Sequence, residues 1–457
     1  MTQPPATSAQ PKLWKLYLNF LVPMIVANIL QSLSGTLNNI YVGQMLGVKA
    51  MAAVSSFFPV LFFLIAFMIG LGSGAAVLIG QAWGAREPER VKAIAGATLA
   101  AGLWFGAAVA LLGGLFTQPL LMALRTPPDV LADAVAYARI MLVAAPCIFV
   151  FILSTSMLRG VSDTKTPLKT LLISTAVGLV LTPALIKGWL GGIGIASQGV
   201  ASGAYAAGAG FLLAMGWTAW HLNQIKSPLA PDTDFLRHVH LNGPILAKVL
   251  KIGLPSAITM VTVSLSELAV LFLVNRYGSQ ATAAYGAVNQ IISYVQFPAI
   301  SIGITASILG AQAIGAGRQQ TLGKIAQTGI AMNLVLTGSL VLLGYLFSRT
   351  IIGLFITDAA VVEMAQTLLH IMLWSCVIMG MSMVLSSLMR ASGAVLVPTL
   401  NSLLTILGIL IPTAWWLSGR YGINGIWAAY PICFGASLLL NTLYYRLVWK
   451  KKPITRL

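Results

Sequence analysis

Long runs of apolar residues, separated by short polar segments, fill almost the whole chain. The runs reach or exceed the ~20 residues that a helix needs to cross a ~30 Å hydrocarbon core, and they lack the alternation of barrel strands. Helices satisfy their backbone hydrogen bonds internally, so they fit this environment. The pattern predicts twelve transmembrane helices, at residues 16–46, 51–80, 93–119, 133–158, 168–187, 193–220, 249–276, 283–310, 325–351, 363–389, 397–419 and 424–448.

The polar segments divide these helices into two groups of six. The only long polar stretch lies between the sixth and seventh predicted helices and contains three prolines and three histidines. We therefore expect an all-α integral membrane protein with a six-helix N-terminal lobe at 1–220, a cytoplasmic linker at 221–248 and a six-helix C-terminal lobe at 249–457.

The second half of the chain repeats the first at an offset of 231 residues. The matching positions are Gln81–Ala85 and Gln312–Ala316, Arg159 and Arg390, Pro167 and Pro398, and Gly47 and Gly278, with Pro23 and Pro255 one residue out of register. A repeat of half the chain in an apolar sequence is typical of a two-lobed transporter.

Composition and charge support a membrane protein and exclude a nucleic-acid binder. Hydrophobic residues make up 58% of the chain and charged residues 8%, while the formal net charge is +17. In the predicted topology, 20 of the 27 Lys and Arg residues lie on the side that holds both termini. An excess of Lys and Arg marks the cytoplasmic face, so both termini are predicted to be cytoplasmic. The run Lys450–Lys452 then faces anionic lipid head groups.

Candidate catalytic or metal-binding chemistry is absent from the sequence. There are four histidines, three of them in the polar linker, and the three cysteines are far apart. No nucleotide-binding loop or paired-carboxylate motif occurs, so we expect neither an enzyme nor a bound metal.

Several motifs together resemble the multidrug and toxic compound extrusion (MATE) transporters. They are Pro23 early in the first helix, Gly80–Ala85 closing the second, and Arg159–Gly160 followed by Asp163–Pro167 after the fourth. The resemblance implies a bacterial inner-membrane exporter of organic cations or amphipathic drugs, working by alternating access and driven by H⁺ or Na⁺ without another cofactor. We expect a monomer that contacts a small-molecule substrate and lipid.

The small residues of these motifs also have a structural interpretation. Gly and Ala at the helix ends Gln81–Arg86 and Gln312–Arg318 allow close approach of a neighbouring helix, so helix packing is preferred to substrate contact. Arg159, Asp163 and Lys165 are expected to form a solvated network of loop charges at the cytoplasmic rim.

Glu267 is the only acidic residue in the middle of a predicted span. A carboxylate in hydrocarbon is costly unless it is paired, hydrated or protonated, which makes Glu267 the candidate coupling residue for H⁺ or Na⁺. The alternative is a structural bond to Asn289 or Ser264. Members of the resembled family often carry further acids, but Asn38 and Thr182 stand at those positions here, and 367–389 contains no acid.

The remaining predictions concern the cavity and its movement. Prolines that kink the first helix of each lobe provide candidate hinges at Pro23 and Pro255, although a harmless first-turn position fits Pro255 better. A lipid-linked oligosaccharide flippase and a membrane-embedded enzyme are the alternatives. The candidate cavity residues, each also able to form an interhelical hydrogen bond, are Gln31, Asn38, Asn39, Tyr41, Asn289, Gln290, Tyr294 and Gln296.

Overall fold

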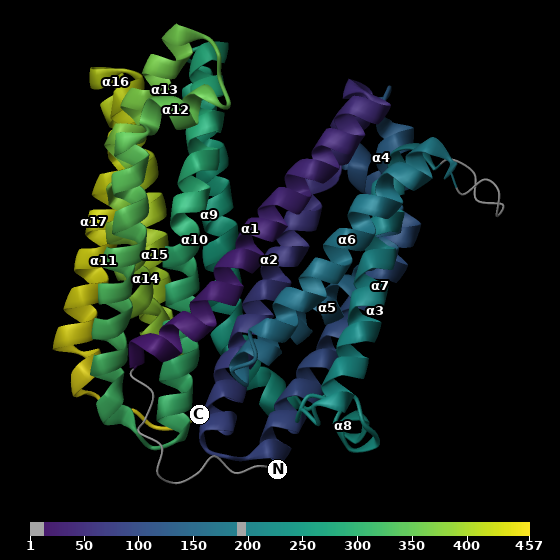
Figure 1. Cartoon of the computed structure of the whole chain (residues 1–457), viewed down its shortest axis with the longest axis vertical. Helices are drawn as coiled ribbons and strands as arrows, with labels where there is room; N and C mark the ends of the chain where they lie inside the picture. Colours follow the sequence, from purple (N-terminus) through teal and green to yellow (C-terminus); the bar gives the residue numbers. More distant parts are fainter. Residues whose placement is uncertain (1–12, 190–197) are drawn as a thin grey trace.

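The computed structural model describes residues 13–189 and 198–457 and is built from helices arranged as two bundles (Figure 1). The N-terminal half comprises α1 (Leu13–Leu46), α2 (Val48–Gly84), α3 (Pro88–Ala123), α4 (Leu131–Val143), α5 (Ala145–Gly160), α6 (Lys165–Lys187) and α7 (Ser202–Gln224). The C-terminal half comprises α9 (Gly243–Asn275), α10 (Ser279–Gly315), α11 (Leu322–Leu346), α12 (Ser348–Gly353), α13 (Ala359–Met372), α14 (Ser375–Ala391), α15 (Leu396–Thr405), α16 (Ile411–Tyr421) and α17 (Ile423–Leu447). The short helix α8 (Thr233–Arg237) lies between them.

The predicted number of membrane spans is confirmed for the part of the chain that is described. Eleven helical segments are long and apolar enough to cross a membrane, and α4 with α5 makes a twelfth span bent by 52°. Most helices extend a few residues beyond the predicted limits. The predicted span 193–220 is only partly testable, because residues 193–197 lie outside the described residues, and its helix α7 runs from Ser202 to Gln224.

The repeat seen in the sequence corresponds to equivalent helices in the two halves. α2 and α10 each contain 37 residues, and each follows a glycine with a left-handed φ, +88° at Gly47 and +94° at Gly278. A side chain rarely adopts this conformation, so the same sharp entry to the helix requires glycine in both copies. The two halves therefore have the same local design.

The first helix of each half crosses to the other half, as Figure 1 shows for α1. The start of α1 packs on α10 and α11, where Tyr17 Oη donates to Ile325 O at 2.9 Å, and its later part packs on α6. α9 packs closely on α2, since a Cβ at Gly74 would lie 2.3 Å from Val249 O and one at Gly253 would lie 2.6 Å from Gly70 O. These two crossing helices join the halves.

Both candidate hinge prolines lie well inside their helices. Pro23 is in the third turn of α1, and Pro255 follows more than three turns of α9. The first-turn interpretation of Pro255 is therefore wrong. α9 begins at Gly243 because the side chain of Asn242 accepts from Ile245 N at 3.2 Å and Pro244 occupies the first turn, where proline is tolerated.

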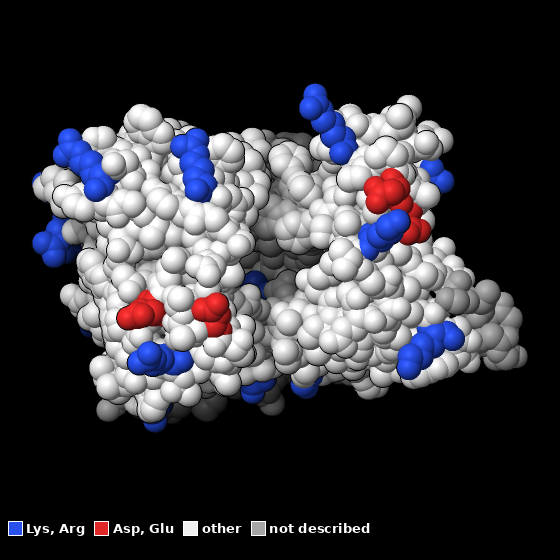
Figure 2. Space-filling view, turned by 90° about the horizontal axis from the view of Figure 1, so that it is seen from above, with Lys and Arg blue, Asp and Glu red and all other residues white. Residues whose placement is uncertain are grey.

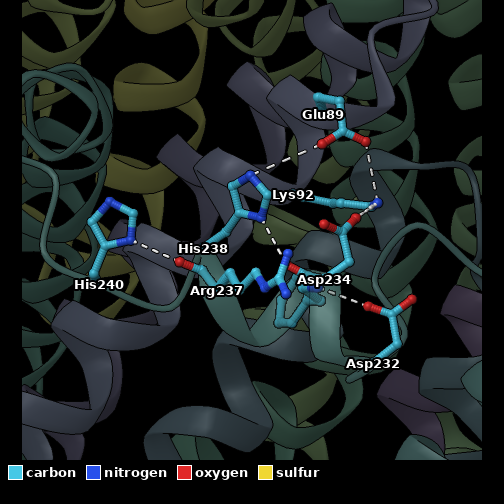
Figure 3. Close-up of polar contacts among 8 residues, drawn as sticks. Glu89, Lys92, Asp232, Asp234, Arg237, His238 and His240 are labelled. Carbon is cyan, nitrogen blue, oxygen red and sulfur yellow. Dashed lines mark hydrogen bonds and ion pairs between the residues drawn. The ribbon is translucent and has the colours of Figure 1, made fainter.

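The polar segment between the halves is shorter than predicted, because α7 continues to Gln224 and α9 starts at Gly243. Its helix α8 is capped by Asp232, whose carboxylate accepts from Phe235 N at 2.7 Å. The segment is held against the start of α3 by an ion pair between Lys92 and Asp234, and Glu89 lies 3.2 Å from Lys92 Nζ (Figure 3).

Large apolar side chains cover the outside of both bundles. Examples of these exposed side chains are Trp104, Leu115, Val180, Leu212, Phe272, Val335, Leu346 and Leu400. A surface of this kind would be unstable in water, whereas it matches the hydrocarbon chains of a bilayer.

Candidate functional site

A cavity of about 1070 Å³ separates the two halves of the molecule. Its walls come from α1, α2, α5, α6 and α7 on one side and from α9, α10, α14 and α17 on the other. Figure 2 looks down on the hollow from the face opposite the C-terminus, which we call the open face. The other end, near the C-terminus and the first turn of α1, is called the closed end.

The closed end is formed by the two copies of the repeated Gln-Ala-x-Gly motif, which meet each other. Gln81 Nε2 donates to Ala391 O and Gln312 Nε2 donates to Gly160 O, both at 2.9 Å. A Cβ at Gly84 would lie 2.1 Å from Gln312 O, and one at Gly315 would lie 1.9 Å from Gln81 O. The predicted role in helix packing is confirmed, and the packing joins the two halves.

The last residues of the chain add to this closure. Leu457 N donates to Gln81 Oε1 at 2.9 Å, and Arg456 forms an ion pair with Glu87. On the other half, Gln319 Nε2 donates to Ile454 O at 3.5 Å. The segment therefore contacts both halves beside the paired motifs.

The structure places most, but not all, of the predicted polar residues on the cavity. Residues of this set that line it are Gln31, Asn38, Tyr41, Asn289 and Gln296. Asn39, Gln290 and Tyr294 are not among its lining residues. Asn39 follows the lining residue Asn38, and Gln290 follows the lining residue Asn289. Successive residues of a helix are rotated by about 100°, so each of these side chains lies on another face of its helix. Tyr294 packs edge-on against Phe297.

Glu267 lines the cavity from α9, on the side of the C-terminal half. It has no hydrogen bond or ion pair with any other described residue, so the bond to Asn289 or Ser264 that we considered is not present. Tyr430 lines the same cavity, and its hydroxyl oxygen lies 3.4 Å from that of Tyr285. The carboxylate is thus free to take up an ion or a proton from the cavity.

Two further charged residues on the cavity were missed by sequence reasoning. Arg159 and Arg390, in the last turns of α5 and α14, both line it, and the Nε of each is buried without a hydrogen-bond partner. The expected loop network is therefore wrong for Arg159, while Asp163 instead accepts from Thr166 N at 2.9 Å at the start of α6. The sequence signal that could have indicated these two residues is the repetition of Arg159 as Arg390, 231 residues later.

Comparisons with known proteins agree with this architecture. The MatE family model matches residues 23–184 and again residues 255–416, once in each half. The chain is 43% identical to "Probable multidrug resistance protein YoeA" of Bacillus subtilis strain 168, over 98% of this chain and 97% of the relative. It is 24% identical to the multidrug export protein MepA of Staphylococcus aureus strain NCTC 8325, over 93% of each chain.

Solved structures of similar fold give the same result. A multidrug resistance MATE family transporter of the MOP superfamily, in its outward-facing conformation, superimposes with a TM-score of 0.86 at 21% identity over 95% of both chains. The Vibrio cholerae MATE transporter VcmN gives a TM-score of 0.88 at 20% identity, covering 97% of this chain and 98% of that one. These likenesses show the fold.

Proposed function

This chain belongs to the MatE family of multidrug efflux transporters, and we propose that it exports amphipathic small molecules by alternating access, driven by H⁺ or Na⁺ that binds at Glu267. The observation that carries the proposal is a cavity between two repeated halves, open at one end, closed at the other and containing a single carboxylate among the described residues. A secondary transporter needs both a closing device and an ion-binding group within the membrane.

The paired glutamines and glycines support the alternating part of the mechanism. The bonds from Gln81 to Ala391 and from Gln312 to Gly160 join one half to the other. Breaking them would let the halves separate at this end while α1 and α9 keep them connected. Rocking of the two halves would then expose the same cavity to the other side of the membrane.

The distribution of Lys and Arg supports an orientation with the closed end in the cytoplasm, in the plasma membrane of a bacterium. The conformation described is then the outward-open one. Reporter fusions after Phe235 and at the C-terminus should both report a cytoplasmic location. A signal from the opposite compartment at either position would reverse the orientation.

Glu267 supports coupling because a carboxylate can bind either H⁺ or Na⁺. A driving ion must be held with different affinity in the two arrangements of the halves, because equal binding would shift nothing. The described residues on the N-terminal wall of the cavity, such as Asn38 and Thr182, include no acid, so the coupling is proposed to use the C-terminal half alone.

The test is transport into or out of proteoliposomes under an imposed pH or Na⁺ gradient. Glu267→Gln preserves the shape of the side chain and removes its titration, so substrate binding should remain and gradient-driven accumulation should disappear. Glu267→Asp should retain part of the activity with a changed pH or Na⁺ dependence. Glu363→Gln, at an exposed acid on α13, is the matched control.

The opposite result is equally clear: gradient-driven transport by Glu267→Gln at the wild-type rate would assign coupling to another group. A flippase for lipid-linked oligosaccharides would favour a strongly cationic cavity, and the charged residues that line this one are two arginines and one glutamate. We propose a monomer as the working unit.

A further inference from the structure

The closed end of the cavity carries two positive charges that no acid neutralises. Arg159 comes from the N-terminal half and Arg390 from the C-terminal half, each one residue before the end of its helix. Neither forms an ion pair with a described residue, and both Nε atoms are buried and unpaired. The ion pairs of the described chain all lie elsewhere, at the start of α3.

Hydrogen bonds at the closed end bring the backbones of these two arginines into the same region. The residue after Arg159 is Gly160, and its carbonyl oxygen accepts from Gln312. The residue after Arg390 is Ala391, and its carbonyl oxygen accepts from Gln81. The two motifs are themselves in contact, because a Cβ at Gly80 would lie 3.1 Å from Ala311 Cβ and 3.7 Å from Gly160 O. Both guanidinium groups therefore border the same end of the cavity.

Glu267 lies at a different depth and does not pair with them. It precedes the end of α9 at Asn275 by eight residues, which is ~12 Å along a helix that ends at the open face. The cavity thus has its acid toward the open face and its two arginines at the closed end. Figure 2 shows a Lys or Arg side chain deep in the hollow.

The physical consequence is a local positive potential inside a cavity with apolar walls. A low-dielectric surrounding strengthens such a potential, and the partial negative charge at a helix C-terminus makes an arginine tolerable there without a ligand. Guanidinium groups bind carboxylate and phosphate oxygens through pairs of parallel hydrogen bonds, and both arginines line the cavity without an ion pair to any described acid.

We propose that Arg159 and Arg390 form an anion-binding site at the closed end of the cavity, which holds the carboxylate or phosphate group of an amphipathic molecule. The apolar body of the ligand lies along the lining above it, for example against Ile152, Ile308 and Met383. The inference rests on the proposed function, since it names the chemical class of the transported molecule. A soluble amphipathic acid and a lipid phosphate share this chemistry.

Binding of radiolabelled cholate, an amphipathic carboxylate, tests the site in the full-length protein in phosphatidylcholine nanodiscs. Arg159→Gln and Arg390→Gln should each weaken binding by about tenfold or more, because each removes a charge-assisted contact. The double variant should lose saturable binding. Arg→Lys variants should recover part of the affinity, since the charge remains and the paired geometry does not.

Two controls separate the site from a purely structural role. Arg139→Gln changes an exposed arginine that does not line the cavity, and it should bind cholate as the wild type does. Tetraphenylphosphonium, an amphipathic cation, should bind the Gln variants at least as well as it binds the wild type. If the double variant fails to fold, Arg159→Lys and Arg390→Lys are compared with the wild type for binding of cholate and of tetraphenylphosphonium. Weaker binding of cholate alone then supports the site.

The source of the anionic group is resolved by adding phosphatidylglycerol. Displacement of cholate from the wild type by this lipid assigns the site to a lipid phosphate, and absence of displacement assigns it to a soluble acid.

Equal cholate affinity in the wild type and the double variant, or no cholate binding by the wild type, would overturn the proposal. Efflux of tetraphenylphosphonium in that case would leave the proposed exporter function standing, whereas cholate binding without any transport would remove the function and keep the site.

Discussion

The closed end of the cavity and its middle differ in how far the two halves of the chain match. At the closed end, Gln81 and Gln312 make equivalent bonds, and Gly84 and Gly315 make equivalent contacts. In the middle, Glu267 has no acidic counterpart on the N-terminal wall, where the one charged lining residue among those described is Arg159 at the closed end.

This difference separates two tasks. Closing the cavity requires that two similar surfaces fit, and repetition of one motif is enough for that. Binding a driving ion requires a group that can carry a negative charge, and one such group in one half is enough. We therefore expect substitutions at the closed end to have equal effects in both halves, and substitution of the coupling acid to have an effect in the C-terminal half only.

The largest effect is expected at the paired glycines. Gly84→Ala and Gly315→Ala each place a Cβ about 2 Å from a backbone oxygen of the other half, so the cavity cannot close at that end. Transport should fall nearly to the level of empty liposomes in both variants. Spin labels at Arg86 and Arg318 should report a longer distance between the halves.

Gly323→Ala in α11 is the matched control, because no atom lies within 4 Å of the added Cβ. It should leave both transport and the label distance unchanged. A strong loss in only one of the two paired variants would break the symmetry that we assign to the closed end, and wild-type transport in both would remove this contact from the mechanism.

An intermediate effect is expected at the two internal prolines. Pro23 and Pro255 each remove a backbone hydrogen bond within a helix that crosses between the halves. From the sequence we expect Pro23→Ala to slow transport more than Pro255→Ala. That ranking assumed that Pro255 lies in the first turn of its helix, whereas it lies inside α9. We therefore expect Pro23→Ala and Pro255→Ala each to slow transport several-fold, with no loss of folded protein.

Pro244→Ala provides a control on the same helix, since this proline lies in the first turn, where no hydrogen bond is lost. Its transport rate should equal that of the wild type. Initial rates of substrate uptake under one fixed gradient are sufficient for the comparison. Wild-type rates in both Pro23→Ala and Pro255→Ala would exclude a hinge role for the internal prolines.

The sequence predicted the fold well because the bilayer imposes a simple requirement on length and polarity. Twelve long apolar runs correspond to twelve spans, and glycines at matching positions correspond to matching turns at Gly47 and Gly278. The start of α9 was misplaced by six residues because the cap Asn242 and the first-turn Pro244 lie in a segment that looks like linker.

The site was less predictable because it depends on how distant helices meet. Asn38 and Asn39 are equally polar, and only the packing of α1 decides that the first faces the cavity. Arg159 is near the end of a span, where charges are normally solvated, and its place on the cavity follows from the contact of its half with the other half. Local sequence does not contain that contact.

The smallest effect is expected at the ion pair that joins the start of α3 to the segment between the halves. Lys92 pairs with Asp234 at the start of α3, whereas the position 231 residues after Lys92 is Gly323. Since this contact has no counterpart and lies outside the cavity, Asp234→Asn should leave transport unchanged. It should lower thermal stability slightly, and less so at high salt, because partly exposed ion pairs are screened.

The pH dependence of this last prediction has a definite sign. The hydrogen bond from Lys92 holds the pKa of Asp234 below its usual range, so the pair contributes stability above the unfolded value of about 4 and loses it as the pH falls through the lower folded value. The stability difference between wild type and Asp234→Asn should therefore be constant from pH 5 to 8 and disappear only in stronger acid. Asp129→Asn, at an exposed acid outside any ion pair of the described residues, should show no difference. A large loss of transport in Asp234→Asn alone would mean that the docked segment is part of the closing device, which would then be asymmetric as well.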